Sequence, residues 1–316
     1  MIAEVENRDQ RNRPISKYLL GLLLLSCTIA LLLPRKLFAD SACLMHVQTA
    51  LALAGVLLGP GLLIQSANCP PVEPGLRILL APILSLALLP LALLWVDIFG
   101  GSWTPTAARL ALSATLIVSL SDLLTRHRAS PRSQSLVPVG VALVFMIALA
   151  IRLYQVRQFL LPSWLDSYHH TLIAQIIRDT GAVPKSYQPY SDLSSFNYHF
   201  GYHAYTAFAA WVTELPTPQI LILSGQLLNA LVVPSLYVAV TLLIGDKTAG
   251  FLAGLMAAVV CRNPAHYVNW GRYPQLMGQT ILPVALALLV CAGKRAICRR
   301  KIPWRTILLA GTTAAG

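Results

Sequence analysis

The side chains best suited to chemistry lie in one polar, aromatic-rich run from Pro162 to His203, which holds four of the seven histidines of the chain. Asp166, His169 and His170 stand at positions i, i+3 and i+4, so on a helix they share one face within a turn. A carboxylate beside imidazoles can act as a general base or hold a divalent metal ion. We therefore predict that these three residues are catalytic.

A second cluster stands at the end of the same run. His199 and His203 are four residues apart and alternate with Tyr198 and Tyr202. We predict that Tyr198, His199 and His203 bind substrate beside the first cluster. The alternative is that the histidines are ordinary interfacial side chains, and for each single histidine both interpretations stay open.

The clusters do not predict a particular metal. An HxxxH spacing with no glutamate between the histidines is a weak zinc signal. A divalent cation is therefore a possible cofactor, with no ligand set assigned.

A second polar segment, residues 262–276, places Arg272 just before an apolar run. Arginine can grip a phosphate with two parallel hydrogen bonds, so we include Arg272 among the substrate-binding residues. The alternative is that it pairs with lipid phosphate, which is the favoured interpretation for Arg262.

Tyr187, Tyr190 and Tyr198 lie away from any apolar run. Sugar rings pack on aromatic faces, so these three side chains could line a carbohydrate site. Aromatic residues closer to the next apolar run are typical of the belt at a membrane interface.

The composition requires that these clusters are positioned by membrane helices. Hydrophobic residues make up 56% of the 316 residues and charged residues only 11%, whereas soluble domains carry about 25% charged residues. The net charge of +12 is spread over the connections between apolar runs, so we predict the lipid bilayer as partner and no nucleic acid. The six cysteines follow no metal or disulfide spacing.

The apolar runs predict an all-α fold, a polytopic transmembrane helical bundle with an outer-face loop that contains an interfacial helix. A spanning helix needs about 20 apolar residues. The expected spans are 18–34, 43–65, 76–98, 106–125, 137–154, 218–244, 248–261 and 277–293, and a ninth begins near Ile307. The first run could be a signal peptide, but an uncleaved signal anchor is preferred.

Positive charges predict the orientation. The N-terminal leader, residues 126–132 and residues 294–305 are rich in Lys and Arg, which mark cytoplasmic connections. Four spans separate each of these segments from the next, so the charges and the span count agree. We expect a multi-pass protein of the plasma or inner membrane with a cytoplasmic N-terminus and outer loops 155–217 and 262–276.

Two local signals refine this scheme. The seventh span, 248–261, is short and carries Gly250 and Gly254, a spacing that allows close helix contact in lipid. In the first outer loop, Pro162-Ser163 resembles a helix start and Gly181 a helix stop. We predict an interfacial helix over Ser163–Thr180 with Asp166 in its first turn.

These residues resemble a known class. A span that ends in Arg152-Leu-Tyr, followed by Trp164-Leu-Asp-Ser-Tyr-His-His and then Thr180-Gly-Ala-Val-Pro, is similar to the GT-C superfamily of integral membrane glycosyltransferases. The resemblance implies a sugar donor linked to polyprenyl phosphate, with Asp166 as the loop acid that acts as base or helps hold a metal. It also implies that Arg272 meets the phosphate of the lipid.

The resemblance covers 137–316, which divides the chain into an N-terminal membrane region of four spans, 1–136, and a GT-C-like module, 137–316. Two departures matter. Many members have a paired acid where this chain has Leu165-Asp166-Ser167, which puts a metal requirement in doubt. The last apolar run stops at Gly316, so the resemblance implies an incomplete, C-terminally truncated module.

Two functions follow from the sequence. The first is transfer of a sugar from a polyprenyl-phosphate-linked donor to an acceptor at the extracytoplasmic face. The second is a transporter or flippase for a lipid-linked or amphiphilic substrate. Transporters place ionisable groups near the middle of the membrane, whereas here such groups gather in the outer loop, which favours the enzyme.

Overall fold

The structure, a computed structural model, describes residues 13–68, 74–125, 136–299 and 304–315. These residues form helices and no strand, so the predicted all-α fold is confirmed. The helices are α2 (Arg13–Leu32), η1 (Arg35–Phe38), α3 (Ala42–Asn68), α4 (Pro74–Ile98), α5 (Pro105–Thr125), α6 (Val137–Gln155), α7 (Leu165–Thr180), α8 (Gly201–Thr213), α9 (Thr217–Ile244), α10 (Lys247–Val259), α11 (Ala265–Asn269), α12 (Tyr273–Arg299) and α13 (Trp304–Ala315).

Six helices in the described part of the chain are long and apolar enough to cross a membrane: α3, α4, α5, α6, α9 and α12. They coincide with the predicted second to sixth spans and with the eighth. Such helices identify an integral membrane protein with the lipid bilayer as its environment.

The first and seventh predicted spans are shorter than the rule requires. The apolar stretches are Tyr18–Leu32 within α2 and Lys247–Val259, which is α10. With 13 residues, α10 is about 20 Å long, against about 30 Å for the apolar core of a bilayer. The return from α9 to α12 is therefore completed by residues 260–272, which include α11.

Contacts between α9 and α12 show that the chain does make this return. The ring of Tyr273 packs on Gly225 near the start of both helices. Near their other ends, the thiol of Cys291 donates to the carbonyl of Leu242 at 3.4 Å. The two helices thus run parallel, and both begin at the same end of the bundle.

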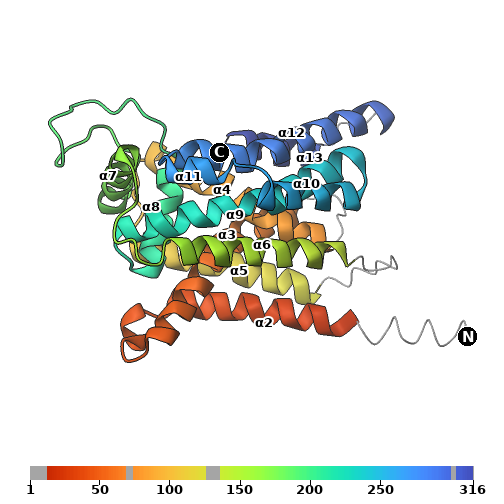
Figure 1. Cartoon of the computed structure of the whole chain (residues 1–316), viewed down its shortest axis with the longest axis horizontal. Helices are drawn as coiled ribbons and strands as arrows, with labels where there is room; N and C mark the ends of the chain where they lie inside the picture. The colour runs from red at the N-terminus through yellow and green to blue at the C-terminus, as the bar shows by residue number, and fades with distance from the viewer. Residues whose placement is uncertain (1–12, 69–73, 126–135, 300–303, 316) are drawn as a thin grey trace, which may run out of the picture.

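Figure 1 shows α7 and α8 at the left-hand end of the bundle, while the start of α2 and the end of α5 lie at the right-hand end. The helix ends that adjoin the positively charged connections, the start of α2 and the end of α5, therefore lie at the end of the bundle opposite α7. Which end faces the cytoplasm stays a prediction.

Helix α7 confirms the predicted helix with Asp166 in its first turn. It starts at Leu165, two residues later than predicted, because Trp164 adopts a left-handed conformation with φ of 75°. It ends at Gly181, as predicted, also in the left-handed region at φ 69°. A side chain on Gly181 would collide with the backbone of Trp103, whose N–H donates to the Gly181 carbonyl at 2.7 Å.

Helix α8 is the buried support on which α7 rests. Every residue from Tyr202 to Thr213 is buried, whereas α7 buries one face. The indole N–H of Trp211 donates to the Arg178 carbonyl at 3.0 Å, and a guanidinium N–H of Arg178 donates to the Leu215 carbonyl at 3.0 Å. These bonds join the ends of α7 and α8.

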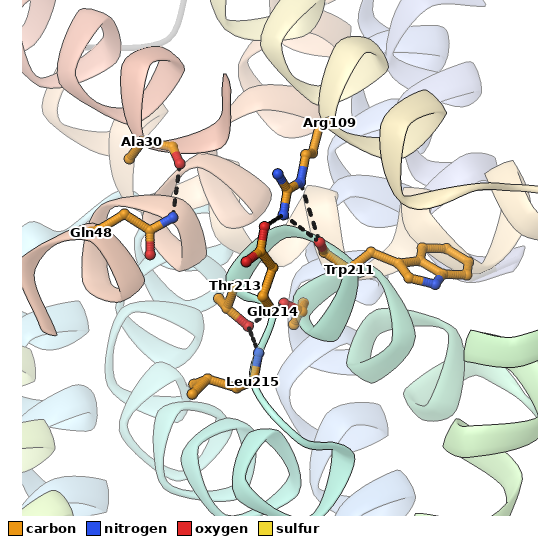
Figure 2. A network of polar contacts seen from close by, with 8 residues as sticks. Ala30, Gln48, Arg109, Trp211, Thr213, Glu214 and Leu215 are labelled. Carbon is orange, nitrogen blue, oxygen red and sulfur yellow. Dashed lines mark hydrogen bonds and ion pairs between the residues drawn. The ribbon is translucent and has the colours of Figure 1, made fainter. Parts of the chain in front are cut away.

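A polar network ties this end of the bundle to α5 (Figure 2). The guanidinium of Arg109 forms an ion pair with Glu214 and donates to the Trp211 carbonyl at 3.2 Å. In the same view, Gln48 of α3 donates to the Ala30 carbonyl of α2 at 3.0 Å.

The predicted division between 1–136 and 137–316 stays a prediction. One core cluster contains side chains from both parts, from Leu24 to Ala310. Helix α4 packs against α8, α9, α12 and α13, so the N-terminal spans contribute to the packing of the outer end.

The start of α12 and the loop between α7 and α8 lie at the same end of the bundle, and this shared end predicts a labelling pattern. In a background without the native cysteines, Ser194→Cys and Asn269→Cys should both react with an impermeant thiol reagent in intact cells. Both positions are exposed, and Thr125→Cys, exposed at the end of α5, should react only after permeabilisation. Opposite accessibility of Ser194→Cys and Asn269→Cys would contradict the shared end.

Close contact of α10 with α9 predicts a stability difference between two glycine substitutions. A methyl group at Gly254 would lie 2.8 Å from the Val233 carbonyl oxygen, whereas one at Gly278 of α12 meets nothing within 4 Å. Gly254→Ala should therefore cost about 1–3 kcal/mol through overpacking. Gly278→Ala should be neutral or stabilising by up to about 1 kcal/mol. Thermal unfolding in detergent micelles measures both, and equal melting temperatures would contradict the close contact.

Candidate functional site

The two predicted outer segments meet through Asp166 and Arg272. The Nε atom of Arg272 lies 3.3 Å from Oδ2 of Asp166, and the side chains are 37% and 40% exposed. The guanidinium also lies 4.7 Å from the ring of Trp270. Its Nε is buried and donates no hydrogen bond to a described residue, while the side chain as a whole is partly exposed, which leaves the terminal N–H groups for an anion from solution.

Gly271 allows this approach. Its φ of 69° is in the left-handed region, and a Cβ there would lie 2.8 Å from the Ser167 hydroxyl and 3.2 Å from the Ser167 amide nitrogen. A larger residue would push the segment before α12 away from the first turn of α7. The position was not among the predicted site residues, although a glycine directly before Arg272 was visible in the sequence.

His170 and His203 form a buried pair behind the ion pair. Their ring nitrogens Nδ1 and Nε2 lie 3.0 Å apart, and the residues are 2% and 0% exposed. Burial lowers the pKa of His170 to about 4 and that of His203 well below its usual range. Both rings are therefore neutral at pH 7, and one donates a hydrogen bond to the other.

This pair is enclosed by two tyrosines that the sequence analysis did not assign to the site. Tyr202 and Tyr273 stack at 5.5 Å between ring centroids, and each lies edge-on to His170. Tyr202 also shares a hydrogen bond of 2.9 Å with Ser224. These contacts place His170 and His203 where they orient α7 on α8, out of reach of a bulky substrate.

His169 lies between the ion pair and the long loop. Its Nε2 is 3.1 Å from the hydroxyl of Tyr187, and its ring stacks on Tyr187 and meets Tyr198 edge-on at 5.0 Å. Burial lowers the pKa of His169, and the charge of Asp166 opposes that shift. A neutral imidazole held in this way can accept or donate a proton.

Tyr198 and His199 form the exposed part of the second cluster. Their rings stack with centroids 4.1 Å apart, and His199 is exposed. Burial of its ring lowers the pKa of His199. A cavity of about 250 Å³ opens beside them and is lined by Pro90, Leu91, Leu94, Tyr198, His199, Phe200, Gly201 and Ala315. The two rings thus border a largely apolar hollow against α4.

The three tyrosines considered for a carbohydrate site lie in different places. Tyr187 is buried behind His169. Tyr190 donates to Asp179 at 2.6 Å, near the end of α7, which lies about 20 Å along the helix from Asp166. Of these three, only Tyr198 lies beside the candidate site with a partly exposed ring, because Tyr187 contacts His169 from the buried side.

The described residues contain no group of three or more His, Cys, Asp or Glu side chains placed to hold a metal ion. Asp166 faces a guanidinium, whose charge opposes binding of a cation at that carboxylate. The arrangement offers a carboxylate, Asp166, that can accept a proton, and a guanidinium, Arg272, whose N–H groups can bind an anion.

The buried histidines predict a pH-dependent stability. A folded-state pKa of about 4 for His170, below its unfolded value near 6.5, means that the unfolded chain binds more protons between these values. Stability should be complete above pH 6.5 and fall as the pH drops toward 4, by roughly 2 kcal/mol at pH 5. Melting temperatures in detergent measure it.

Replacing both rings by Asn should remove much of this fall, because the two fully buried imidazoles then no longer have to stay neutral. His46→Asn, at an exposed position in α3, should keep the wild-type pH profile. An unchanged profile in the double variant would contradict the assignment.

Comparison with known proteins supplies a family. A family model described as a family of unknown function, DUF6541, matches residues 54–316. The match begins within α3 and includes α7, α8 and the segment that carries Arg272. No curated protein and no solved structure matches the chain. The chain belongs to DUF6541, a family of unknown function.

Proposed function

We propose that this protein transfers a sugar from a polyprenyl-phosphate-linked donor to an acceptor at the extracytoplasmic face, in the manner of GT-C glycosyltransferases. The observation that supports it best is the ion pair of Asp166 and Arg272, 3.3 Å apart at the end of the bundle. This pair offers a proton acceptor and a phosphate-binding guanidinium side by side.

Each residue has one role in the proposed reaction. Arg272 binds the phosphate that links the sugar to the lipid. The acceptor hydroxyl attacks the anomeric carbon while Asp166 takes its proton. The bond between the anomeric carbon and the phosphate oxygen breaks, and polyprenyl phosphate leaves with its charge balanced by Arg272.

The ion pair itself gives a reason why Asp166 would become a better proton acceptor only when the donor is bound. A phosphate can occupy a guanidinium with two parallel hydrogen bonds, which a single contact between Nε and a carboxylate oxygen does not match. Donor binding would therefore draw Arg272 away from Asp166. A carboxylate that no longer shares its charge with a guanidinium accepts a proton more readily.

The surrounding residues support this chemistry without taking part in bond changes. His170 and His203 are neutral and hold α7 in place. The stacked rings of Tyr198 and His199 offer an aromatic surface for the sugar beside the cavity against α4. The charge of Asp166 acts on His169, one turn along α7, and we assign to His169 the onward transfer of the proton.

Loss of the proton acceptor should nearly abolish transfer. Removal of a general base typically lowers the rate by about 10²–10⁴. The rate of sugar transfer by the Asp166→Asn variant of the full-length protein should therefore fall by that factor, while its expression stays normal. The assay follows a radiolabelled polyprenyl-phosphate sugar in membranes with and without the protein. Asp192→Asn is the matched control, since Asp192 is exposed in the same loop. Wild-type transfer by Asp166→Asn would refute the assignment.

The phosphate contact should depend on the shape of the guanidinium. Arg272→Lys keeps the charge but loses the two-pronged contact, so it should lower transfer by about tenfold or more. Arg262→Lys, at an exposed position earlier in the same segment, should have little effect. Lipid-linked substrate that crosses the membrane at the wild-type rate in all these variants, with no sugar transferred, would indicate the transporter instead.

A further inference from the structure

A second cavity lies at the other end of α7, away from the Asp166 site. Its volume is about 300 Å³, and it is lined by Pro105, Thr106, Arg109, Arg178, Asp179, Ala210, Trp211 and Glu214. These residues come from the start of α5 and from the ends of α7 and α8. Since Asp179 is about 20 Å along the helix from Asp166, the two sites are separate.

One of the two arginines in this cavity is already neutralised. Figure 2 shows the guanidinium of Arg109 turned toward Glu214 and toward the Trp211 carbonyl, with which it forms an ion pair and hydrogen bonds. These contacts fix the wall of the cavity where α5 meets α8. They leave no net charge on that wall.

Arg178 is a cation without a charged partner in the described part of the chain. Its Nη1 donates to the Leu215 carbonyl at 3.0 Å and to the Thr217 hydroxyl at 3.2 Å, both neutral acceptors. Among the described residues no carboxylate forms an ion pair with it, and its Nε and Nη2 donate to none of them. The guanidinium therefore keeps donors for an anion.

Asp179, the next residue, is an anion for which the described residues supply no charged partner. Its carboxylate accepts from the Tyr190 hydroxyl at 2.6 Å and from the Gln175 side-chain amide at 2.8 Å, both neutral donors. It too forms no ion pair with a described residue. The cavity thus presents one uncompensated positive charge and one uncompensated negative charge.

The cavity lies beside the ends of candidate membrane spans, where we expect the lipid head groups. Two candidate membrane spans, α5 and α9, begin at Pro105 and Thr217 beside it. The start of α5 adds partial positive charge, and the ends of α7 and α8 add partial negative charge. The start of α5 therefore favours an anion on its side of the cavity, and the ends of α7 and α8 favour a cation on theirs.

We propose that this cavity binds the head group of a zwitterionic phospholipid with a primary ammonium. The phosphate contacts Arg178 and the start of α5, and the ammonium donates to Asp179. A volume of about 300 Å³ is at the lower end of small-molecule sites, so it accepts a head group and leaves the acyl chains along the helices. This proposal is independent of glycosyl transfer.

The proposal predicts an order among lipids. An ethanolamine head group carries N–H donors for Asp179, whereas a choline group carries none and a glycerol group carries no positive charge. Native mass spectrometry of the detergent-purified chain, loaded with equal amounts of the three phospholipids, should show phosphatidylethanolamine retained about tenfold more than the others. Soluble O-phosphoethanolamine should compete for the same site.

Variants separate binding from folding. Arg178→Gln should lose the preferential retention, and Asp179→Asn should lose the preference for ethanolamine over choline. Thr106→Phe fills the cavity without removing a hydrogen bond made by Arg178, so it should also lose retention with an unchanged melting temperature. Arg157→Gln and Asp192→Asn, exposed and outside the cavity, are the matched controls.

Two results would overturn the proposal. Equal retention of the three lipids by the wild-type chain would show that the head group is not recognised. A chain that binds O-phosphoethanolamine but retains no phosphatidylethanolamine would show that the ligand is soluble. Neither result depends on whether the Arg178→Gln variant transfers sugar. Failure of the lipid-binding proposal is therefore distinguishable from failure of the proposed function.

Discussion

The arrangement of the outer end depends on how closely the backbone before α12 approaches the first turn of α7. Gly271 has no side chain and a left-handed conformation, which lets the chain pass against Ser167. Only this approach carries Arg272 to Asp166, because α8, α9, α10 and α11 lie between the two residues in the chain. A larger residue would separate them by a few ångström, enough to weaken any chemistry that needs both.

The close approach would have little value if α7 could move, and the buried histidines restrict it. His170 and His203 are enclosed with Tyr202 and Tyr273, and the hydrogen bond between the neutral rings satisfies one nitrogen of each ring, while Nδ1 of His203 has no partner among the described residues. A charged ring would be unfavourable there. Because His170 and His203 are neutral, they are poor electrostatic catalysts. They can instead hold α7, and with it the Asp166 carboxylate, in a fixed position.

The sequence predicted those features that depend on local patterns. Apolar runs located the spanning helices, and the Gly181 stop located the end of α7, because both signals act within a few residues. The start of α7 was misplaced by two residues, since the positive φ at Trp164 has no sequence signal. The sequence did not predict that residues 260–272 complete the seventh crossing without a long helix. That path depends on the parallel packing of α9 and α12.

The site was partly predictable for the same reason. Helical spacing grouped Asp166 with His169 and His170, but spacing alone did not separate the exposed acid from the buried His170 on that face. The pairing of His170 with His203, and of Asp166 with Arg272, joins residues 33 or more positions apart. Such contacts follow from tertiary packing, which one sequence does not encode as a local pattern.

The two ends of α7 differ in what their acids require, and this difference separates their roles. Asp166 lies in the first turn, where the helix dipole favours a negative charge, and it has a guanidinium beside it. Asp179 lies in the last turn, where the dipole disfavours a negative charge by about 0.3–1 kcal/mol. Neutral hydrogen bonds from Tyr190 and Gln175 offset part of that cost without cancelling the charge. A carboxylate placed where its own helix disfavours a negative charge, beside an Arg178 that forms no ion pair with a described residue, is better explained by a ligand that carries both charges than by the stability of α7 alone.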